Sequence, residues 1–374
     1  MRILTLANTP LDPASGSGYV ILGYAERLRA LGHSVELLGP VDFEPFYGAR
    51  RAIRHRQTLG MAAACLDRLG AGGYDVVEIY GAEGWLAMSL LAATPGRRYL
   101  LAIHSNGIET HCSEVLAAAG LTDRTRWRPD PARLSALAFR RADALVTVSD
   151  WDAGWASQRG YAPNRRILAL DNPLPDRFLD QPLSLDREPE IGYCGAWLPI
   201  KGIAALGREI PEVLSAFPDW RFVLVGVGDS FRAEEHFPED VRPRISVVPR
   251  ADRETELRAL YHRFSIVVAP SVYESFGLAT AEAMACGAAV VASPVGFAAG
   301  LADGQEVVHL RPDRPLTAAV GRLIRDPDLR HRVATGGWER AQALRWEPAA
   351  SRLAEAYQSW TAELRRGIRK GSNQ

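Results

Sequence analysis

Residues 270–287 constrain the fold of this chain more than any other stretch. An apolar strand is predicted at 266–269, directly before it, and a second at 288–292, directly after it. Between them, residues 278–285 are good helix formers, and Gly287 is placed to end the helix in the left-handed conformation. A strand–loop–helix–strand unit makes its two strands parallel. Its loop then lies at the carboxyl edge of the sheet, where open α/β sheets bind ligands.

Two carboxylates flank the turn of this unit. Glu274 precedes the helix, and Glu282 follows about two helical turns later. The amides of Phe276, Gly277 and Leu278 are expected near the helix N-terminus, where unpaired N–H groups and the helix dipole attract electron-rich oxygens. The two carboxylates could accept hydrogen bonds from two different sugar rings. A capped, buried helix with Glu282 on a wet face fits the spacing equally well.

The complete motif, ESFGLATAEAMACGAAVVAS from Glu274 to Ser293, resembles the signature of the retaining GT-B glycosyltransferases of family 4. In that family, paired glutamates bracket a nucleotide sugar. The resemblance implies that Glu274, with Ser275 and the amides after it, contacts the transferred sugar, and that Glu282 holds the ribose hydroxyls. It also implies an α/β fold of the GT-B type, with two facing Rossmann-like domains and a cleft between them.

Length and composition agree with this fold class. The 374 residues suffice for two domains. The composition, with 47% hydrophobic and 24% charged residues, predicts a globular chain. The net charge of zero gives no support for nucleic acid as a partner. Four scattered cysteines without metal-ligand spacing favour a reducing compartment, and no apolar run has the length of a signal or membrane segment. We therefore expect a cytoplasmic protein.

Proline distribution predicts the domain boundary. Residues 1–175 read as an N-terminal Rossmann-like acceptor domain, and 190–347 read as a second α/β run, the donor domain. Residues 176–189 are rich in proline and lack periodicity, so they are predicted to be a linker. The last helix, within 348–374, is expected to cross back to the first domain, as it does in the resembled family.

Lys201 is the strongest single cation in the sequence. It follows the predicted strand 190–195 by a short loop and begins a helix, where an ammonium can meet a pyrophosphate. An exposed first-turn lysine is the ordinary alternative. The loop around it resembles the family's phosphate loop, but Ala196 stands where the family has arginine. Arg250, after the strand 245–248, is a candidate substitute. A second departure is Phe297, where a second glycine is common.

The first loop of the chain contains Gly16 and Gly18 directly before a helix. Two glycines at this place let the backbone approach a ligand or a phosphate closely, although the spacing is not a dinucleotide fingerprint. A tight surface turn fits the residues equally well. In the resembled family this loop lies over the donor phosphates or the acceptor, which favours both glycines as site residues.

His104 closes the predicted strand 99–104 and is followed by a turn. A histidine at the carboxyl end of a strand is expected to face the ligand edge rather than the core. Many family members place a histidine here, near the transferred sugar, so the resemblance implies a hydrogen-bonding and electrostatic role. His111 is expected on the surface of the following helix.

Arg50, Arg51, Arg54 and Arg56 form a basic cluster within seven residues. A solvated helix face is the usual explanation of such a cluster. Contact with anionic lipid, or with a lipid-linked phosphate acceptor, is the functional alternative. This alternative would place the protein peripherally at the inner face of a membrane.

These features predict a retaining glycosyltransferase that moves a sugar from a nucleotide-diphospho-sugar to a glycan, lipid-linked or small-molecule acceptor. No metal-ligand cluster and no glycosidase-type carboxylate pair is visible, so neither a metal nor another cofactor is expected. Lys201 and the helix amides would stabilise the departing diphosphate, while Glu274 and His104 orient the sugar. In the family, the leaving phosphate itself takes the acceptor proton. A sugar-nucleotide epimerase of the same fold and a non-catalytic binding module remain as alternatives.

Overall fold

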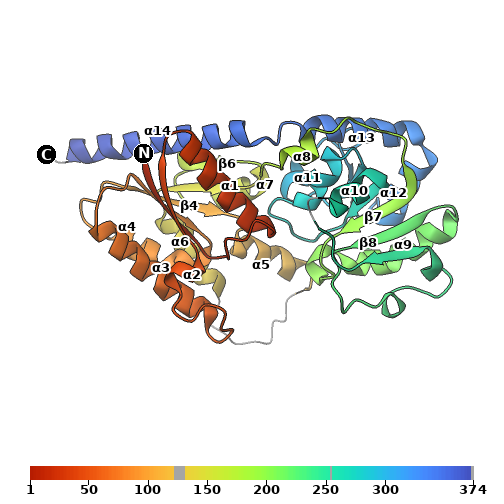
Figure 1. The fold of residues 1–374 in the computed structure, drawn as a ribbon, viewed down its shortest axis with the longest axis horizontal. Coiled ribbons are helices and arrows are strands. Elements are labelled where there is room, and N and C mark those ends of the chain that lie inside the picture. Colours follow the sequence, from red (N-terminus) through yellow and green to blue (C-terminus); the bar gives the residue numbers. More distant parts are fainter. Residues whose placement is uncertain (122–130, 253–254, 372–374) are drawn as a thin grey trace. The chain divides into compact units, whose positions relative to one another are not determined.

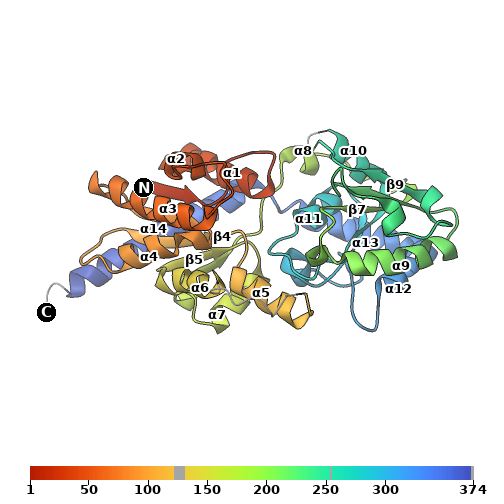
Figure 2. The same ribbon diagram turned by 90° about the horizontal axis from the view of Figure 1, so that it is seen from below.

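The computed structural model describes residues 1–121, 131–252 and 255–371, which divide into two compact units (Figures 1 and 2). Unit 1 comprises Met1–Glu114, Asp123–Pro173 and Trp346–Gln374, and unit 2 comprises Val115–Thr122 and Leu174–Arg345. Residues 176–189, predicted to be a linker, fall within unit 2.

Unit 1 is built on a six-stranded sheet in the order β2-β1-β3-β4-β5-β6, in which all neighbouring strands are parallel. The strand order reverses between β1 and β3. The strands are β1 (Arg2–Ala7), β2 (Ser34–Leu38), β3 (Val76–Tyr80), β4 (Leu100–Ser105), β5 (Ala144–Thr147) and β6 (Ile167–Ala169).

Helices connect these strands, as parallel pairing requires. They are α1 (Gly16–Ala30), α2 (Pro40–Phe43), α3 (Ile53–Gly70), α4 (Trp85–Ala92), α5 (Glu109–Ala118), α6 (Pro131–Arg141) and α7 (Asp150–Gln158). The last helix of the chain, α14 (Trp346–Gly371), connects no strands but packs on the same sheet. Two single-turn helices, η1 (Ala82–Gly84) and η2 (Asn164–Arg166), precede α4 and β6.

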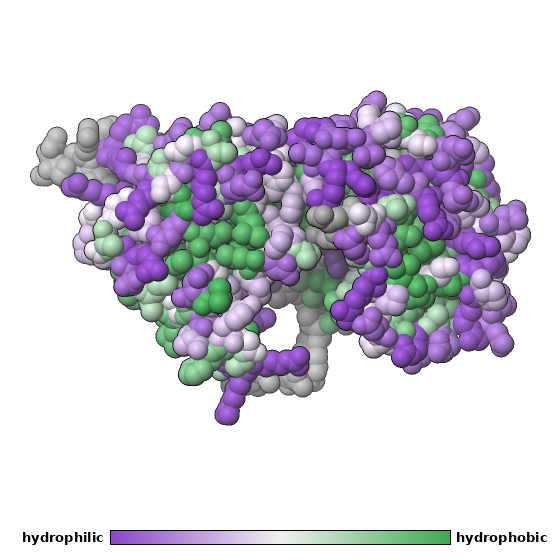
Figure 3. Space-filling model, in the orientation of Figure 1, coloured by the Kyte–Doolittle hydropathy of each residue, from purple (hydrophilic) through white to green (hydrophobic). Residues whose placement is uncertain are grey.

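The two faces of the unit 1 sheet carry separate cores, because side chains alternate along each strand. Leu101 and Ile103 of β4 belong to the core that also contains residues of α3, α4 and α6. Leu100 and Ala102 belong to the opposite core, which contains residues of α1 and α14. Trp346 at the start of α14 packs so closely on Gly23 of α1 that a Cβ at Gly23 would lie 2.0 Å from the indole. The outer surface of α14 is mainly hydrophilic (Figure 3), as expected for an amphipathic helix on a sheet.

Unit 2 contains a second parallel sheet, in the order β12-β11-β10-β7-β8-β9. Counted within the unit, this is the 3-2-1-4-5-6 order of a Rossmann fold, and it reverses between β7 and β10. The strands are β7 (Glu188–Cys194), β8 (Arg221–Val225), β9 (Ile245–Val248), β10 (Phe264–Ala269), β11 (Ala289–Ala292) and β12 (Val308–His309).

The helices of unit 2 pack on this sheet, with α9 against α12 and α11 against α13. They are α8 (Asp176–Leu179), α9 (Ile203–Ala216), α10 (Glu256–Arg263), α11 (Leu278–Ala285), α12 (Leu316–Arg325) and α13 (Pro327–Ala341), with single turns η3 (Pro199–Lys201), η4 (Ala233–Glu235), η5 (Arg242–Arg244) and η6 (Gly296–Gly300). Two six-stranded parallel sheets, each with its own helices and its own reversal of strand order, confirm the predicted α/β fold class.

Candidate functional site

The loops that follow β7 and β10 meet at the point where the strand order of unit 2 reverses. Ligands of open α/β sheets bind outside the carboxyl ends of the strands at such a switch point. The Val272 amide donates to the Ile200 carbonyl at 2.8 Å, which ties the two loops together. Gly202 has φ +74°, and a Cβ there would lie 1.9 Å from the Pro270 carbonyl oxygen. Only glycine therefore permits this close approach of the loops.

Lys201 and Glu274, two of the predicted site residues, are brought together by these loops. The Lys201 Nζ lies 2.5 Å from the Glu274 Oε1, and the Ser271 hydroxyl donates to the same oxygen at 2.9 Å. The side chains of the ion pair are 31% and 23% exposed. The pair is thus fixed in position yet accessible to solvent, so a bound anion can reach the ammonium.

The N-terminus of α11 lies beside this ion pair. Gly277 adopts φ +100° immediately before the helix, a backbone conformation that residues with a Cβ rarely adopt. The amides of Gly277 and Leu278 have no hydrogen-bond partner among the described residues. Gly296, with φ +57°, packs against the same loop, and a Cβ there would lie 2.6 Å from the Phe276 carbonyl oxygen. The two free amides form a local site for an electron-rich oxygen.

The other predicted residues of this motif are partly enclosed. Phe276 is 4% exposed and packs against Phe297, with ring centroids 5.0 Å apart. The Ser275 hydroxyl donates to the Tyr273 hydroxyl at 3.2 Å. Glu282 is 3% exposed, and the Tyr261 hydroxyl lies 3.4 Å from its Oε2. Burial, with the nearby Cys194 and Glu282, raises the pKa of Tyr261 well above its usual value, so this phenol keeps its proton.

Arg250 lies away from this ion pair. It follows β9, which is separated from β7 by β8, so the two strands are about 10 Å apart. Its guanidinium is paired with Asp229 at 2.6 Å, and its side chain is 80% exposed. Ala196, at the position where the family has arginine, is exposed. Neither position provides a second cation next to Lys201 in this structure.

In unit 1, His104 is fully buried and does not face open solvent at the sheet edge. The alternation of β4 explains this difference from the expectation, because His104 points to the same face as Leu100 and Ala102, under α1 and α14. Its Nδ1 lies 3.0 Å from the Glu78 Oε1 and 2.8 Å from the Tyr80 hydroxyl. Its Nε2 is buried and has no hydrogen-bond partner among the described residues.

Gly16 and Gly18 form the first turn of α1. Ser15 caps the helix, and its hydroxyl accepts a hydrogen bond from the Gly18 amide at 3.0 Å. A Cβ at Gly18 would lie 2.2 Å from the Asp12 carbonyl oxygen, so this glycine is required by local packing. The Gly18 amide is therefore already hydrogen-bonded to the capping residue Ser15. Of the two glycines, Gly16 is the one at the N-terminal end of the helix.

A group of polar residues that the sequence did not single out lies at the switch point of unit 1. Asn8 follows β1 and Glu83 follows β3, and the Asn8 side-chain amide donates to the Glu83 carboxylate at 2.9 Å. Glu109, after β4, has a buried Oε2 without a partner. Burial, reinforced by the charge of Glu83, raises the pKa of Glu109 to about 7. The spacing Gly81-Ala-Glu83 and Gly107-Ile-Glu109 after two apolar strands is the sequence signal for these carboxylates.

Two further residues differ from expectation. His111 is 5% exposed rather than on the surface, and its Nδ1 lies 2.7 Å from Asp152, beside Trp155. Arg56 contacts the Glu44 carboxylate at 2.5 Å and donates to the Ala49 carbonyl at 2.6 Å, so its side chain is only 16% exposed. Arg56 thus stabilises its own loop, and three arginines of the cluster remain exposed.

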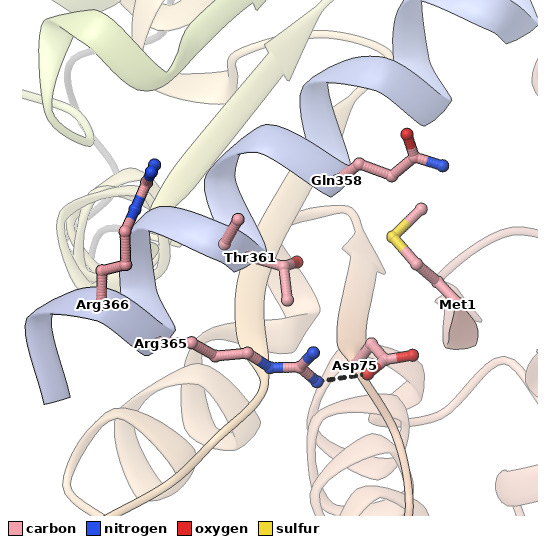
Figure 4. Close-up of a pocket in the computed structure, with 7 residues that line it drawn as sticks. Met1, Asp75, Gln358, Thr361, Arg365 and Arg366 are labelled. Carbon is pink, nitrogen blue, oxygen red and sulfur yellow. Dashed lines mark hydrogen bonds and ion pairs between the residues drawn. The ribbon is translucent and has the colours of Figure 1, made fainter. Parts of the chain in front are cut away.

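A pocket of about 440 Å³ lies at the opposite, amino edge of the unit 1 sheet (Figure 4). It lies between α14 and the starts of β1 and β3, and Arg365 is ion-paired with Asp75 at its rim. This pocket is separate from the switch points. In the part of the chain that the structure describes, no three His, Cys, Asp or Glu side chains are grouped as a metal would require.

Two family models match the chain. The model described as glycosyl transferases group 1 matches residues 188–326, and the glycosyl transferase 4-like domain matches residues 15–173. The "D-inositol 3-phosphate glycosyltransferase" of a Nocardioides strain is 30% identical over 98% of this chain and 91% of its own length. The "phosphatidyl-myo-inositol mannosyltransferase" of Mycolicibacterium smegmatis is also 30% identical, over 96% of this chain and 94% of its own length.

Solved structures with the same fold include the sucrose-phosphate synthase of Thermosynechococcus elongatus, with a TM-score of 0.74 and 22% identity over 97% of this chain and 100% of its own. The catalytic domain of Arabidopsis thaliana starch synthase IV, bound to ADP and acarbose, has a TM-score of 0.67 at 15% identity over 96% and 99% of the two chains. The Anabaena protein HepE, in complex with UDP and glucose, has a TM-score of 0.63 at 17% identity over 96% and 100%.

Proposed function

Because this chain belongs to the group 1 glycosyltransferases, family 4, we propose that it transfers a sugar from a nucleoside-diphosphate donor with retention of anomeric configuration. The observation that carries this proposal is the Lys201–Glu274 pair beside the free amides of Gly277 and Leu278, at the switch point of unit 2. A cation, a carboxylate and two amide donors within one pair of loops suit a diphosphate and the sugar attached to it.

In the proposed reaction, the bond between the anomeric carbon and the diphosphate oxygen breaks, and positive charge develops on the sugar. The Lys201 ammonium and the α11 amides stabilise the negative charge that develops on the leaving diphosphate. Glu274 stabilises the positive charge on the sugar. The acceptor hydroxyl then forms the new bond on the same face, and its proton passes to the leaving phosphate. No metal ion is required in this scheme.

Hydrogen bonding of the transferred sugar by His104 is part of the proposal and rests on the family resemblance. The acceptor is proposed to be a glycan, a lipid-linked sugar or a small polyol. Since the named relatives act on inositol phosphate and on phosphatidyl-myo-inositol, these two compounds are the first acceptors to test.

The reaction class can be tested by incubating UDP-, GDP-, ADP- and dTDP-sugars with the protein, with and without acceptor. Transfer requires the acceptor, and the coupling constant of the product's anomeric proton reports retention. An epimerase would change the donor sugar when no acceptor is present, and a binding module would give neither product. Either of these two outcomes would contradict the proposal.

Glu282 is proposed to hold the ribose hydroxyls. Replacing Glu282 by glutamine removes the charge without creating a cavity and should weaken nucleoside diphosphate binding by about 1–3 kcal/mol. Wild type should also prefer the nucleoside diphosphate over its 2′-deoxy form, and the variant should lose most of this preference. Calorimetric titration with both ligands measures the effect. A preference that survives the substitution would show that the buried carboxylate serves the packing of α11 only.

Peripheral contact with anionic lipid is proposed for the arginine loop, which we define as residues 45–55. Every residue of this loop is exposed. It combines Arg50, Arg51 and Arg54 with two large apolar side chains, Phe46 at 65% and Tyr47 at 52% exposure. Basic residues beside exposed aromatic ones are typical of surfaces that lie on membranes. No helix of the described residues is both long and apolar enough to cross a bilayer.

Changing Arg50, Arg51 and Arg54 together to glutamine should abolish most sedimentation with anionic vesicles at low salt. The expected loss is about 1 kcal/mol for each arginine near the surface, or roughly 100-fold in partition. Arg56 is left in place because it holds the loop together. The matched control replaces Arg98, Arg322 and Arg332, which are also exposed. Equal loss in both variants would contradict a specific lipid-binding face.

A further inference from the structure

Glu78 is a carboxylate enclosed in the middle of an apolar sheet. It lies on β3 with 2% exposure, in a strand whose residues are all buried. Three groups contact it. The Thr5 hydroxyl donates to its Oε2 at 2.8 Å, the Tyr357 hydroxyl donates to its Oε1 at 2.6 Å, and the His104 Nδ1 lies 3.0 Å from the same Oε1. Such a group is retained only where its partners offset the cost of burying it.

The contacts determine where the hydrogen on His104 must lie. Burial alone would raise the pKa of Glu78, but the hydrogen bonds from His104, Tyr357 and Thr5 lower it below its usual value. An ionised carboxylate only accepts hydrogen bonds. The Nδ1 of His104 therefore carries the hydrogen, and its Nε2 is the nitrogen without a protein partner.

Tyr80 shows what would happen without the carboxylate. Its hydroxyl lies 2.8 Å from the same Nδ1, and burial keeps the phenol protonated by raising its pKa well above the usual value. If Glu78 were absent, this hydroxyl would be free to donate to the Nδ1. The hydrogen of the neutral imidazole would then move to the Nε2. The two neighbours thus favour opposite tautomers of one ring.

We infer that Glu78 is a positioning residue that fixes His104 as the Nδ1–H tautomer, and that Tyr357 makes this arrangement depend on the C-terminal helix α14. The Nε2 lone pair is then the acceptor left for a sugar hydroxyl, a use that rests on the proposed function of His104 and requires the buried ring to be uncovered when the ligand binds. Leaving a buried nitrogen unpaired costs free energy, so a ligand hydroxyl that donates to Nε2 relieves that cost on binding.

The other polar groups around the ring do not supply an alternative partner. Tyr24 of α1 lies with its ring centroid 5.2 Å from that of His104, and its own hydroxyl has no partner among the described residues. Burial raises the pKa of Tyr24 above its usual value, which keeps this phenol neutral. Glu78 is accordingly the group through which Thr5 of β1 and Tyr357 of α14 act on the ring.

The test is the tautomer of His104 in the full-length protein, read from the ¹⁵N shifts and long-range ¹⁵N–¹H couplings of its ring, with His104→Gln used to assign the signal. Wild type should show the hydrogen on Nδ1. Glu78→Gln keeps an oxygen that can accept, and should keep this tautomer. Glu78→Leu removes the acceptor and should move the hydrogen to Nε2.

Wild-type protein with hydrogen on Nε2, whether on that nitrogen alone or on both, would overturn the inference, even if Glu78→Leu did not fold. An unchanged tautomer in a folded Glu78→Leu variant would overturn it as well. Tyr357→Phe removes one hydroxyl only and tests the link to α14. Part of the hydrogen is expected to move to Nε2 in this variant. An unchanged spectrum would overturn the link to α14. Transfer activity is measured separately on the same variants. A tautomer that inverts without loss of activity would leave the positioning role standing and contradict the proposed role of His104 in transfer.

Discussion

Replacing Glu274 by glutamine is expected to slow sugar transfer about 100- to 1,000-fold, the cost of about 2.7–4 kcal/mol that is typical of losing one group directed at the transition state in a preorganised site. Glutamine keeps the size of the side chain and an oxygen that can accept from the Ser271 hydroxyl. It removes only the negative charge that would face the developing positive charge on the sugar. The rate with saturating donor and acceptor measures this effect.

The same substitution should not weaken binding of the nucleoside diphosphate. The Lys201 ammonium is paired with Glu274, so losing the carboxylate leaves the ammonium free for phosphate. Affinity for the diphosphate should therefore stay the same or rise while turnover falls. Glu234→Gln, at an exposed position of the same unit, is the matched control and should leave both quantities unchanged. A large loss of diphosphate affinity in Glu274→Gln would show that the carboxylate holds the nucleotide and not the sugar.

Replacing Lys201 by methionine is expected to weaken nucleoside diphosphate binding about 10- to 100-fold, as a lost charge-assisted hydrogen bond is worth about 1.5–3 kcal/mol. Methionine retains much of the apolar stem, so packing of the loop is little disturbed. Binding of the nucleoside without phosphates should be unaffected. Because the side chain is partly exposed, the difference between the two ligands should shrink as salt rises.

Calorimetric titration of diphosphate and nucleoside at low and high salt measures this difference. Lys201→Arg keeps the positive charge and serves as the control, with a smaller loss expected. The fold should survive in both variants, since partly exposed ion pairs contribute little to stability. If methionine left the ratio of the two affinities unchanged, Lys201 would be an ordinary surface cation.

The motif around Glu274 was predictable because each of its residues carries local information. The expected strand at 266–269 lies within β10, the helix begins at Leu278 as expected, and Gly287 ends it with φ +77°. Parallel pairing of β10 and β11 follows from the helix between them. The ion pair between Lys201 and Glu274, 73 residues apart, could not be read from local pattern, because it depends on which two strands are neighbours.

His104 shows the limit of the argument from strand ends. The sequence places this histidine correctly in the last part of a strand, but whether its side chain faces a ligand or the core depends on the alternation of the strand and on the helix that covers that face. That helix is α14, whose contact with this sheet involves residues more than 200 positions away. A glutamate within the apolar run Val76–Tyr80 is the signal that could have located the buried cluster, since a carboxylate in such a strand needs partners.

The arginine cluster was only partly interpretable for a related reason. The count of four arginines says nothing about which of them are used internally. Glu44 is buried and requires a cation, and Arg56 is the arginine whose position on α3 brings it to that carboxylate. Three arginines remain exposed, of which Arg54 also lies 3.9 Å from Glu83, a distinction that depends on how α2 and α3 pack.

Thermal unfolding of the protein with UDP, GDP, ADP and dTDP tests most directly whether the switch point of unit 2 binds a nucleoside diphosphate. A ligand at a hundred times its dissociation constant adds about 2.7 kcal/mol to the free energy of unfolding. At least one of the four should raise the melting temperature of the wild-type protein, and Lys201→Met should show a smaller rise with that same nucleotide. No rise with any of the four, at millimolar concentration, would contradict the account.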